Sequence, residues 1–111
     1  MQTPEICLEA VKQNWKALQY AKEQTLEVCL EALKQSYGRA LRYIDNQTPE
    51  ICIAAVQQNG WILEYVREQT PEICVEAIKR EPEAYKYVRL PETEPEREKF
   101  IRKLSFLLLS L

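Results

Sequence analysis

Apolar and polar residues follow one another along most of the chain in short blocks that recur every 22 or 23 residues. In the first block, positions 6, 7, 8, 10 and 11 are apolar, whereas positions 9, 12, 13, 16, 19, 22 and 23 are polar. The apolar arc is wider than the single core-facing stripe of an ordinary surface helix. A short helix needs such an arc when it is pressed between a partner helix and the next repeat. The pattern therefore predicts stacked short helices.

Four copies of one unit make up residues 2–90. The phrase QTPEIC occurs at 2–7, 47–52 and 69–74, and QTLEVC stands at 24–29. The repeats span 2–23, 24–46, 47–68 and 69–90, and the second holds one extra residue near Gly38. Self-similarity at a fixed period indicates a repeat architecture. We expect residues 1–111 to form a single all-α domain, an α-solenoid of four two-helix repeats with a C-terminal capping helix over about 95–111.

The first half of each repeat predicts an α-helix that begins at Thr-Pro-Glu. The side-chain oxygens of Thr3, Thr48 and Thr70 can cap these helices. The Pro that follows suits the first helical position, and the Glu meets the positive end of the helix dipole. In repeat two Leu26 takes the place of Pro. We expect the first of these helices to run from about Pro4 to Gln13.

The second half of each repeat predicts another short helix, over about Trp15 to Lys22 in repeat one. Asn14 and the pair Asn59-Gly60 mark the break before it, because Asn and Gly reach left-handed dihedral angles at low cost. In repeat four the break is Glu81-Pro82, where Pro82 is expected to open the second helix. Helices this short are marginal in water, so packing must hold them.

Residues 91–111 break the repeat register at two prolines and then predict one more helix from about residue 96. Its apolar residues at 100, 101, 104, 107, 108 and 111 fall on one face, which should cap the open end of repeat four. Phe106 and Leu109 lie off that face, and an exposed apolar cluster usually marks an interface. A wrapped cap and a contact with a second copy or a partner remain open alternatives. Phe106 and Leu109 are the candidate self-association residues, and the uncapped first repeat is a second possible homodimer contact.

Several stretches resemble a known kind of tandem repeat. These are EICLEAVKQN with ALQYAKE, and AAVQQNGWILEYVRE. They are similar to repeats of the type A-A-V-x-x-N-G-x-A-L-x-Y-[AV]-x-x-E, which belong to a domain-of-unknown-function family in bacterial and large-DNA-virus proteins. The resemblance covers 2–90, with departures at Glu81-Pro82, at Tyr85 and at the insertion in repeat two. It implies a helical repeat fold and no assigned activity, so no catalytic residue is carried over.

Composition narrows the choice of partner. The chain is 46% hydrophobic, with a net charge of −2 and a pI of about 5.3. A nucleic-acid or anionic-membrane binder normally carries a basic excess, so neither partner is favoured. No basic and apolar leader follows Met1, and no run approaches the roughly 18 apolar residues of a membrane span. We expect a soluble, cytoplasmic protein that does not bind membranes.

The four cysteines are the first candidates for chemistry. They occur once per repeat, at 7, 29, 52 and 74, without a C-x-x-C pair or any His. Neighbouring stacked helices lie about 8–10 Å apart, which exceeds the reach of a disulfide or of shared zinc ligands. We interpret the cysteines as a ladder of small buried residues, and we expect no metal and no other cofactor.

Catalytic machinery is not visible in the sequence. The chain has no His and a single Asp, Asp45, so most hydrolytic schemes lack their parts. No nucleophile–base pair or phosphate-binding loop can be recognised. We therefore expect the protein not to be an enzyme.

Comparison of the four repeats separates constant from variable positions. Cys, Ala and Tyr recur unchanged at one position each, which indicates packing. Variable polar positions should face solvent or a partner. We interpret Trp15, Trp61 and Tyr37 as wedges near the helix–helix turns, or as interface anchors if they are exposed. The candidate partner-binding residues are Lys16, Gln19, Arg39, Arg42, Glu64, Lys86 and Trp61.

Two functional hypotheses follow. The leading one is a non-enzymatic helical-repeat module that binds a protein partner. The alternative is a small phage- or mobile-element-encoded inhibitor, for example an anti-CRISPR protein, that binds and blocks a host nuclease complex. A basic row that includes Lys16, Arg39 and Arg42 leaves a nucleic-acid groove as a minor alternative.

Overall fold

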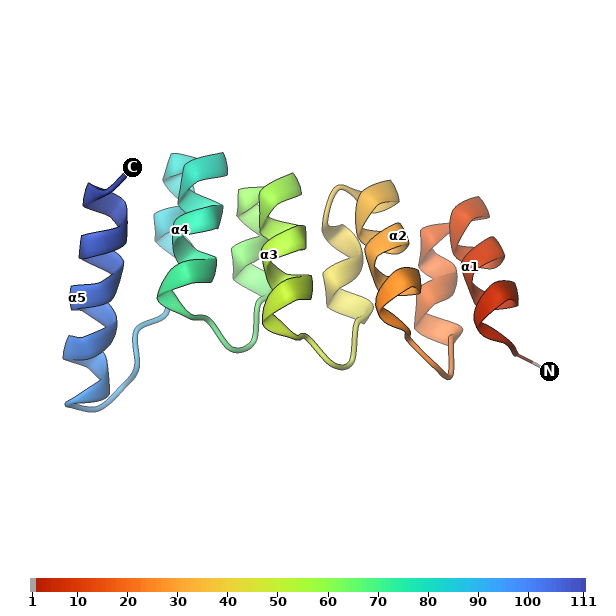
Figure 1. The fold of residues 1–111 in the computed structure, drawn as a ribbon, viewed down its shortest axis with the longest axis horizontal. Coiled ribbons are helices and arrows are strands. Elements are labelled where there is room, and N and C mark those ends of the chain that lie inside the picture. Colours follow the sequence, from red (N-terminus) through yellow and green to blue (C-terminus); the bar gives the residue numbers. More distant parts are fainter. Residues whose placement is uncertain (1) are drawn as a thin grey trace.

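The computed structural model describes residues 2–111 as a row of paired helices (Figure 1). Each repeat contributes an α-helix followed by a short 3₁₀-helix, so the all-α solenoid predicted from the repeats is confirmed. The α-helices are α1 (Pro4–Gln13), α2 (Leu26–Ser36), α3 (Pro49–Gln58), α4 (Pro71–Arg80) and the C-terminal α5 (Glu96–Leu109). The 3₁₀-helices are η1 (Trp15–Tyr20), η2 (Arg39–Tyr43), η3 (Gly60–Tyr65) and η4 (Pro82–Tyr87).

The repeats stand side by side along one axis. In Figure 1 the α-helices form the front layer and the 3₁₀-helices lie behind them, while the two ends of the chain lie at opposite ends of the row. The molecule measures 48 × 25 × 19 Å along its principal axes. Each element contacts its own partner and the elements of adjacent repeats. Stability therefore arises between neighbours, as in other repeat arrays.

The α-helices begin as the Thr-Pro-Glu pattern predicts. Oγ1 of Thr3 accepts a hydrogen bond from the backbone N–H of Ile6 at 3.2 Å. The corresponding threonines of the other repeats make the same bond, and the repeat-two cap forms although Leu26 replaces Pro. The predicted bounds of the first helix, Pro4 and Gln13, are confirmed.

The second helices differ from the prediction in type and in their N-terminal geometry. They are 3₁₀-helices, and the first ends at Tyr20 rather than near Lys22. Asn14 and Asn59 do not adopt left-handed dihedral angles but are extended, with φ of −155°. Each is a cap whose side-chain oxygen accepts a hydrogen bond from the backbone N–H two residues later. Among residues 2–111, positive φ occurs only at Tyr37 and Gly38, where the extra residue of repeat two is accommodated.

The spacing of apolar residues is compatible with the 3₁₀ form. Three residues make one turn of a 3₁₀-helix, so side chains three apart share a face. Leu41 and Ile44 have this spacing, and so do Leu63 and Val66; all four are buried. In repeat four Pro82 opens η4, as predicted. The short second helix is thus held by one apolar edge rather than by intrinsic helix propensity.

Burial shows that each repeat rests on the one before it. Ile51 and Ile73, at the same position of repeats three and four, are only 5% and 1% exposed. Ile6 holds this position in the first repeat and is 55% exposed. The difference reflects the neighbour that repeat one lacks on this side. The wide apolar arc of the sequence is therefore the stacking surface between repeats.

The first Gln of repeats two, three and four fastens that repeat to the preceding one. Oε1 of Gln24 accepts from the backbone N–H of Asp45 at 2.9 Å. Its Nε2 donates to the carbonyl oxygen of Tyr43 at 2.9 Å and to that of Leu18, in the preceding repeat, at 3.3 Å. Gln47 and Gln69 repeat this pattern. We call this set of bonds the glutamine staple. It supplies partners to a backbone N–H and a backbone carbonyl after each 3₁₀-helix, and it adds a second bond to the Leu carbonyl oxygen of the preceding repeat, which already accepts from the backbone.

Helix α5 covers the open end of repeat four, but with fewer residues than expected. Phe100 is buried and Leu104 packs beside it, whereas Ile101 and Leu111 are exposed, contrary to the prediction of one continuous apolar face. Ile101 lies about 100° around the helix from the buried Phe100, so the contact face is narrower than predicted. Leu111 lies beyond the end of α5 at Leu109. Lys103 Nζ also lies 2.6 Å from Glu72 Oε2 at the start of α4.

Within residues 2–111, every helix is too short or too polar to cross a bilayer.

Candidate binding groove

Stacking of the 3₁₀-helices brings equivalent variable residues into two rows. Lys16, Arg39 and Trp61 occupy one position of successive repeats, and Gln19, Arg42, Glu64 and Lys86 occupy the position three residues later. We call these the first row and the second row. Because three residues make one 3₁₀ turn, both rows lie on the same side of the 3₁₀ layer. That side therefore carries two of the positions that vary most between repeats.

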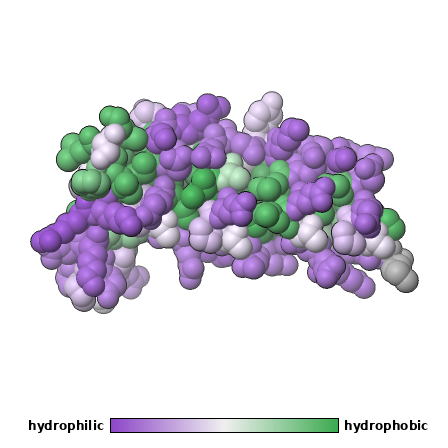
Figure 2. Space-filling model, in the orientation of Figure 1, coloured by the Kyte–Doolittle hydropathy of each residue, from purple (hydrophilic) through white to green (hydrophobic). Residues whose placement is uncertain are grey.

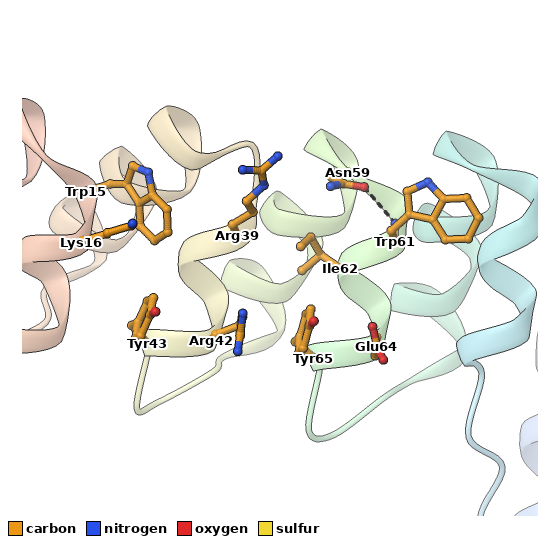
Figure 3. Close-up of a pocket in the computed structure, with 10 residues that line it drawn as sticks. All are labelled: Trp15, Lys16, Arg39, Arg42, Tyr43, Asn59, Trp61, Ile62, Glu64 and Tyr65. Carbon is orange, nitrogen blue, oxygen red and sulfur yellow. Dashed lines mark hydrogen bonds between the residues drawn. The ribbon is translucent and has the colours of Figure 1, made fainter.

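A groove of about 450 Å³ lies along this side, across η1, η2 and η3 (Figure 3). We call it the η groove. Figure 3 shows an upper line formed by Trp15, Lys16, Arg39 and Trp61, and a lower line formed by Tyr43, Arg42, Tyr65 and Glu64. Asn59 and Ile62 complete the lining. This volume falls within the range of small-ligand and peptide-anchor pockets.

Aromatic rings form the rigid frame of the groove. The rings of Trp15 and Tyr43 are 6.0 Å apart between centroids and tilted by 43°. Trp61 makes an edge-on contact with Tyr87 of the next repeat, at 6.0 Å and 80°. Trp61 nevertheless remains 37% exposed and Tyr65 38% exposed. Large aromatic side chains that are held in place yet accessible are effective anchors for a partner.

Three cations line the groove without acidic partners. Among residues 2–111, no carboxylate lies within ion-pair distance of Lys16, Arg39 or Arg42. Other faces carry paired cations, as in Lys12–Glu9 at 3.5 Å and Lys79–Glu76 at 3.2 Å, together with some that have no ion pair among residues 2–111, such as Lys34. The groove therefore has an excess of positive charge, with three cations and one carboxylate, Glu64, although the whole chain has a net charge of −2.

Aromatic rings position two of these cations. The guanidinium carbon of Arg42 lies 4.9 Å from the centroid of the Tyr65 ring, and Figure 3 shows Arg42 between Tyr43 and Tyr65. Lys16 Nζ lies 5.9 Å from the centroid of Trp15. Such contacts stabilise a cation without consuming its hydrogen-bond donors. The donors of both side chains remain available to a ligand.

The backbone beneath Trp61 is fixed by Asn59 and Gly60. Asn59 Oδ1 accepts a hydrogen bond from the backbone N–H of Trp61 at 3.1 Å. A Cβ atom added to Gly60 would lie 2.4 Å from the carbonyl oxygen of Ala77 on α4. Only Gly allows η3 to approach α4 this closely, so the Asn-Gly pair determines where Trp61 is presented.

The structure brings together most of the partner-binding residues predicted from the sequence. Lys16, Arg39, Arg42, Glu64 and Trp61 line the η groove. Gln19 and Lys86 are exposed on η1 and η4 but do not line it, and Lys86 lies 3.6 Å from Glu83. The sequence left Trp15 open as a packing wedge or an interface anchor, and it did not indicate Tyr43, Asn59, Ile62 or Tyr65 as lining residues. The tyrosines are the same in every repeat, so nothing in the pattern separated the accessible Tyr65 from the half-buried Tyr43.

The cysteines are buried and free, as the ladder interpretation predicts. Each thiol lies near the Gln five residues earlier; Cys74 Sγ, for example, is 3.6 Å from Oε1 of Gln69. Burial raises the pKa of the Cys29 and Cys74 thiols to about 11 and also raises the pKa of Cys52. Within residues 2–111, no three Cys, Asp or Glu side chains come together in a way that could hold a metal ion.

The two ends of the row expose apolar surface. Phe106 and Leu109 are 69% and 87% exposed, and Figure 2 shows apolar surface gathered over the later turns of α5. At the other end, Ile6 and Tyr20 border a shallow apolar hollow of about 140 Å³. The predicted exposure of Phe106 and Leu109 is therefore confirmed. Their role in self-association remains a prediction.

Comparison with known proteins identifies a family. No curated protein sequence and no solved structure matches the chain. The family described as "Domain of unknown function (DUF4116)" matches twice, over residues 25–70 and 48–92. The two matches overlap by one repeat, in agreement with the stacked units of the structure, and together they cover residues 25–92, more than half of the chain. The chain is therefore a member of the DUF4116 family.

Proposed function

We propose that this chain is a non-enzymatic helical-repeat module that binds a protein partner in the η groove. The observation that carries the proposal is the separation of roles along each repeat. The residues that are constant between repeats hold the stack, whereas Lys16, Arg39, Arg42, Glu64 and Trp61 differ between repeats and converge on one accessible groove. Solenoids typically bind partners along such continuous surfaces.

The chemistry of the lining residues also supports binding. The groove combines exposed aromatic rings with cations that have no acidic partner among residues 2–111. Trp, Tyr and Arg are the residue types that most often dominate the energy of protein interfaces. None of the ten lining residues is a Cys, Ser, Thr, His or Asp that could serve as a nucleophile or as its usual base.

An inhibitor of a nuclease complex is the alternative function. An inhibitor that imitates nucleic acid would present a line of carboxylates. The η groove presents three cations and one carboxylate, Glu64. The charge of the groove therefore supports a binding module in preference to a nucleic-acid mimic, whether the chain comes from a cell, a phage or a virus.

Site-specific photo-crosslinking in the native host tests the proposal. A photoreactive amino acid is introduced in place of Lys16, inside the groove, and in a separate variant in place of Lys34, which is exposed on α2 outside the groove. We expect one protein to crosslink at position 16 and not at 34, and the crosslink to disappear when Trp61→Ala is added. Crosslinks of equal yield at both positions, or no protein crosslink at 16, would refute the proposed function.

A further inference from the structure

We propose that the η groove binds an extended, acidic protein segment in which two carboxylate side chains are three residues apart and an apolar side chain follows at the same interval. This inference rests on the proposed function and specifies the chemistry of the partner. It is derived from three features of the groove: its charge, its aromatic anchors and the distance between repeats.

The distance between repeats sets the interval. Packed helices lie about 8–10 Å apart. An extended segment in the polyproline II conformation advances about 3.1 Å per residue and makes one turn every three residues, so every third side chain points to the same side. Three residues of an extended segment therefore span one repeat. A segment that runs along the row presents every third side chain to the same position of successive 3₁₀-helices.

The first row determines which side chains fit at those positions. Repeats one and two place Lys16 and Arg39 in this row, and repeat three places Trp61 there. The two cations favour carboxylates at two successive intervals. Trp61 favours an apolar side chain at the third. The resulting pattern is acidic-x-x-acidic-x-x-apolar, read from repeat one to repeat three.

The second row reinforces this order. Arg42 lies beneath the repeat-two position and is already held over the Tyr65 ring, so it loses little side-chain freedom when it pairs with a carboxylate. Glu64 lies in repeat three and would repel a third carboxylate beside Trp61. The groove therefore selects acidic residues at one end and rejects them at the other.

A nucleic acid would meet the same groove less favourably. Its phosphates carry a negative charge at every nucleotide, including those that would lie beside Glu64. The chain as a whole has a net charge of −2, which opposes the approach of a polyanion. A protein segment can place its charges selectively, whereas a nucleic-acid strand cannot.

Selection from a peptide library tests the inference. The full chain is immobilised and challenged with randomised twelve-residue peptides displayed on phage. We expect enriched peptides to contain two Asp or Glu residues at an interval of three, followed by an aromatic or aliphatic residue after a further three. A synthetic copy of an enriched peptide should lose about tenfold in affinity when its two acidic residues are moved next to each other, because the two carboxylates can then no longer reach Lys16 and Arg39 at the same time.

Two charge reversals provide a matched comparison. Arg39→Glu and Lys34→Glu change the net charge equally, and both side chains are exposed and make no ion pair among residues 2–111. We expect Arg39→Glu to weaken binding of the enriched peptide at least tenfold and Lys34→Glu to change it less than twofold, with thermal unfolding unchanged in both. Arg39→Lys should retain most of the affinity.

The outcomes separate this inference from the proposed function. Enriched peptides that require Trp61 but show no acidic interval, or that tolerate Arg39→Glu, would overturn the acidic segment and leave the binding module standing. If no peptide is enriched but a protein crosslinks at position 16, the acidic-segment inference is overturned and the proposed binding function still stands. A twelve-nucleotide oligothymidine that binds more tightly than any enriched peptide, with the same dependence on Arg39, would overturn both.

Discussion

The side chain of Gln47 reaches forward across its own repeat to Arg67, whose backbone N–H donates a hydrogen bond to Oε1 of Gln47 at 2.9 Å. Nε2 of the same amide donates to the carbonyl oxygens of Tyr65 at 3.1 Å and of Leu41, in the preceding repeat, at 3.3 Å. One amide therefore bonds to three backbone groups from two repeats, of which the Leu41 carbonyl oxygen also accepts from the backbone N–H of Ile44.

Loss of this staple should destabilise the stack. We expect Gln47→Ala to lower the free energy of unfolding by about 1–3 kcal/mol, because the backbone groups that it satisfies lose their partner. Chemical denaturation followed by circular dichroism measures the change. Gln35→Ala is the control, because the exposed side chain of Gln35 donates a hydrogen bond to Glu31 Oε2 on its own helix. The Gln35→Ala substitution should change the free energy of unfolding by no more than about 0.5 kcal/mol. Equal effects of the two variants would contradict the staple.

Much of the fold could be predicted because its signals are local. The recurring QTPEIC or QTLEVC phrase determines the repeat boundaries, and Thr-Pro-Glu determines where the α-helices begin. The bounds of α1 therefore follow from ten residues. The dihedral angles at Asn14 and Asn59 could not be predicted, because Asn is equally suited to ending one helix and to capping the next. In the structure each Asn has both roles: its backbone N–H donates to the end of the α-helix, and its side chain caps the following 3₁₀-helix.

The groove could be predicted only in part. Variation between repeats identified Lys16, Arg39 and Trp61, because exposed positions are free to differ. It could not identify Tyr65, because Tyr recurs in every repeat while its surroundings change. Trp15 and Trp61 cover the tyrosines of repeats two and four, and no such Trp contact covers Tyr65 of repeat three. Exposure of a constant residue depends on its neighbour, which a single position in the sequence does not show.

Substitution of Gly60 should disturb both stability and the groove. Gly60→Ala places a Cβ atom against the carbonyl oxygen of Ala77 and against Glu81. We expect a loss of roughly 1–3 kcal/mol in the free energy of unfolding, because η3 must move away from α4. Thermal and chemical unfolding measure the loss, and the exposed Ser105→Ala on α5 should change neither by more than about 0.5 kcal/mol. A Gly60→Ala protein of wild-type stability would show that the contact is not close.

The buried thiols should make stability depend on alkaline pH. Burial raises the pKa of Cys29 and Cys74 to about 11 in the folded protein, above the value of about 8.5 expected in the unfolded chain. The unfolded state therefore releases its thiol protons first as the pH rises, and stability is lost progressively between about pH 8.5 and 11. We expect Cys74→Ala to reduce the slope of unfolding free energy against pH in this range, compared with the wild type.

Thiol reactivity provides an independent measurement of the same burial. A thiolate-specific reagent at pH 8 should react slowly with the native protein, because the thiols of Cys29, Cys52 and Cys74 stay protonated and inaccessible. All four cysteines should react at once in denaturant. Rapid reaction of more than one thiol in the native protein would contradict a closed ladder.

The exposed end of α5 should promote self-association. Phe106 and Leu109 leave apolar area in water that a second copy can cover. We expect sedimentation at tens of micromolar to show dimers that dissociate in the double variant Phe106→Ser, Leu109→Ser. Lys99→Ser and Arg102→Ser, on the same helix, provide the control. A wild type that remains monomeric at this concentration would show that the two side chains stay solvent-exposed.

The range of the glutamine staple has a consequence for how such proteins change length. Each glutamine staple joins a repeat only to the repeat before it. These bonds therefore do not depend on how many repeats the array contains. Excision of residues 47–68 would bring Gln69 directly after Asn46 and restore the same junction that Gln47 now makes. A gene that gains or loses one such repeat would still encode a chain that folds. The same event would change the row of variable side chains, and with it the choice of partner, in a single step.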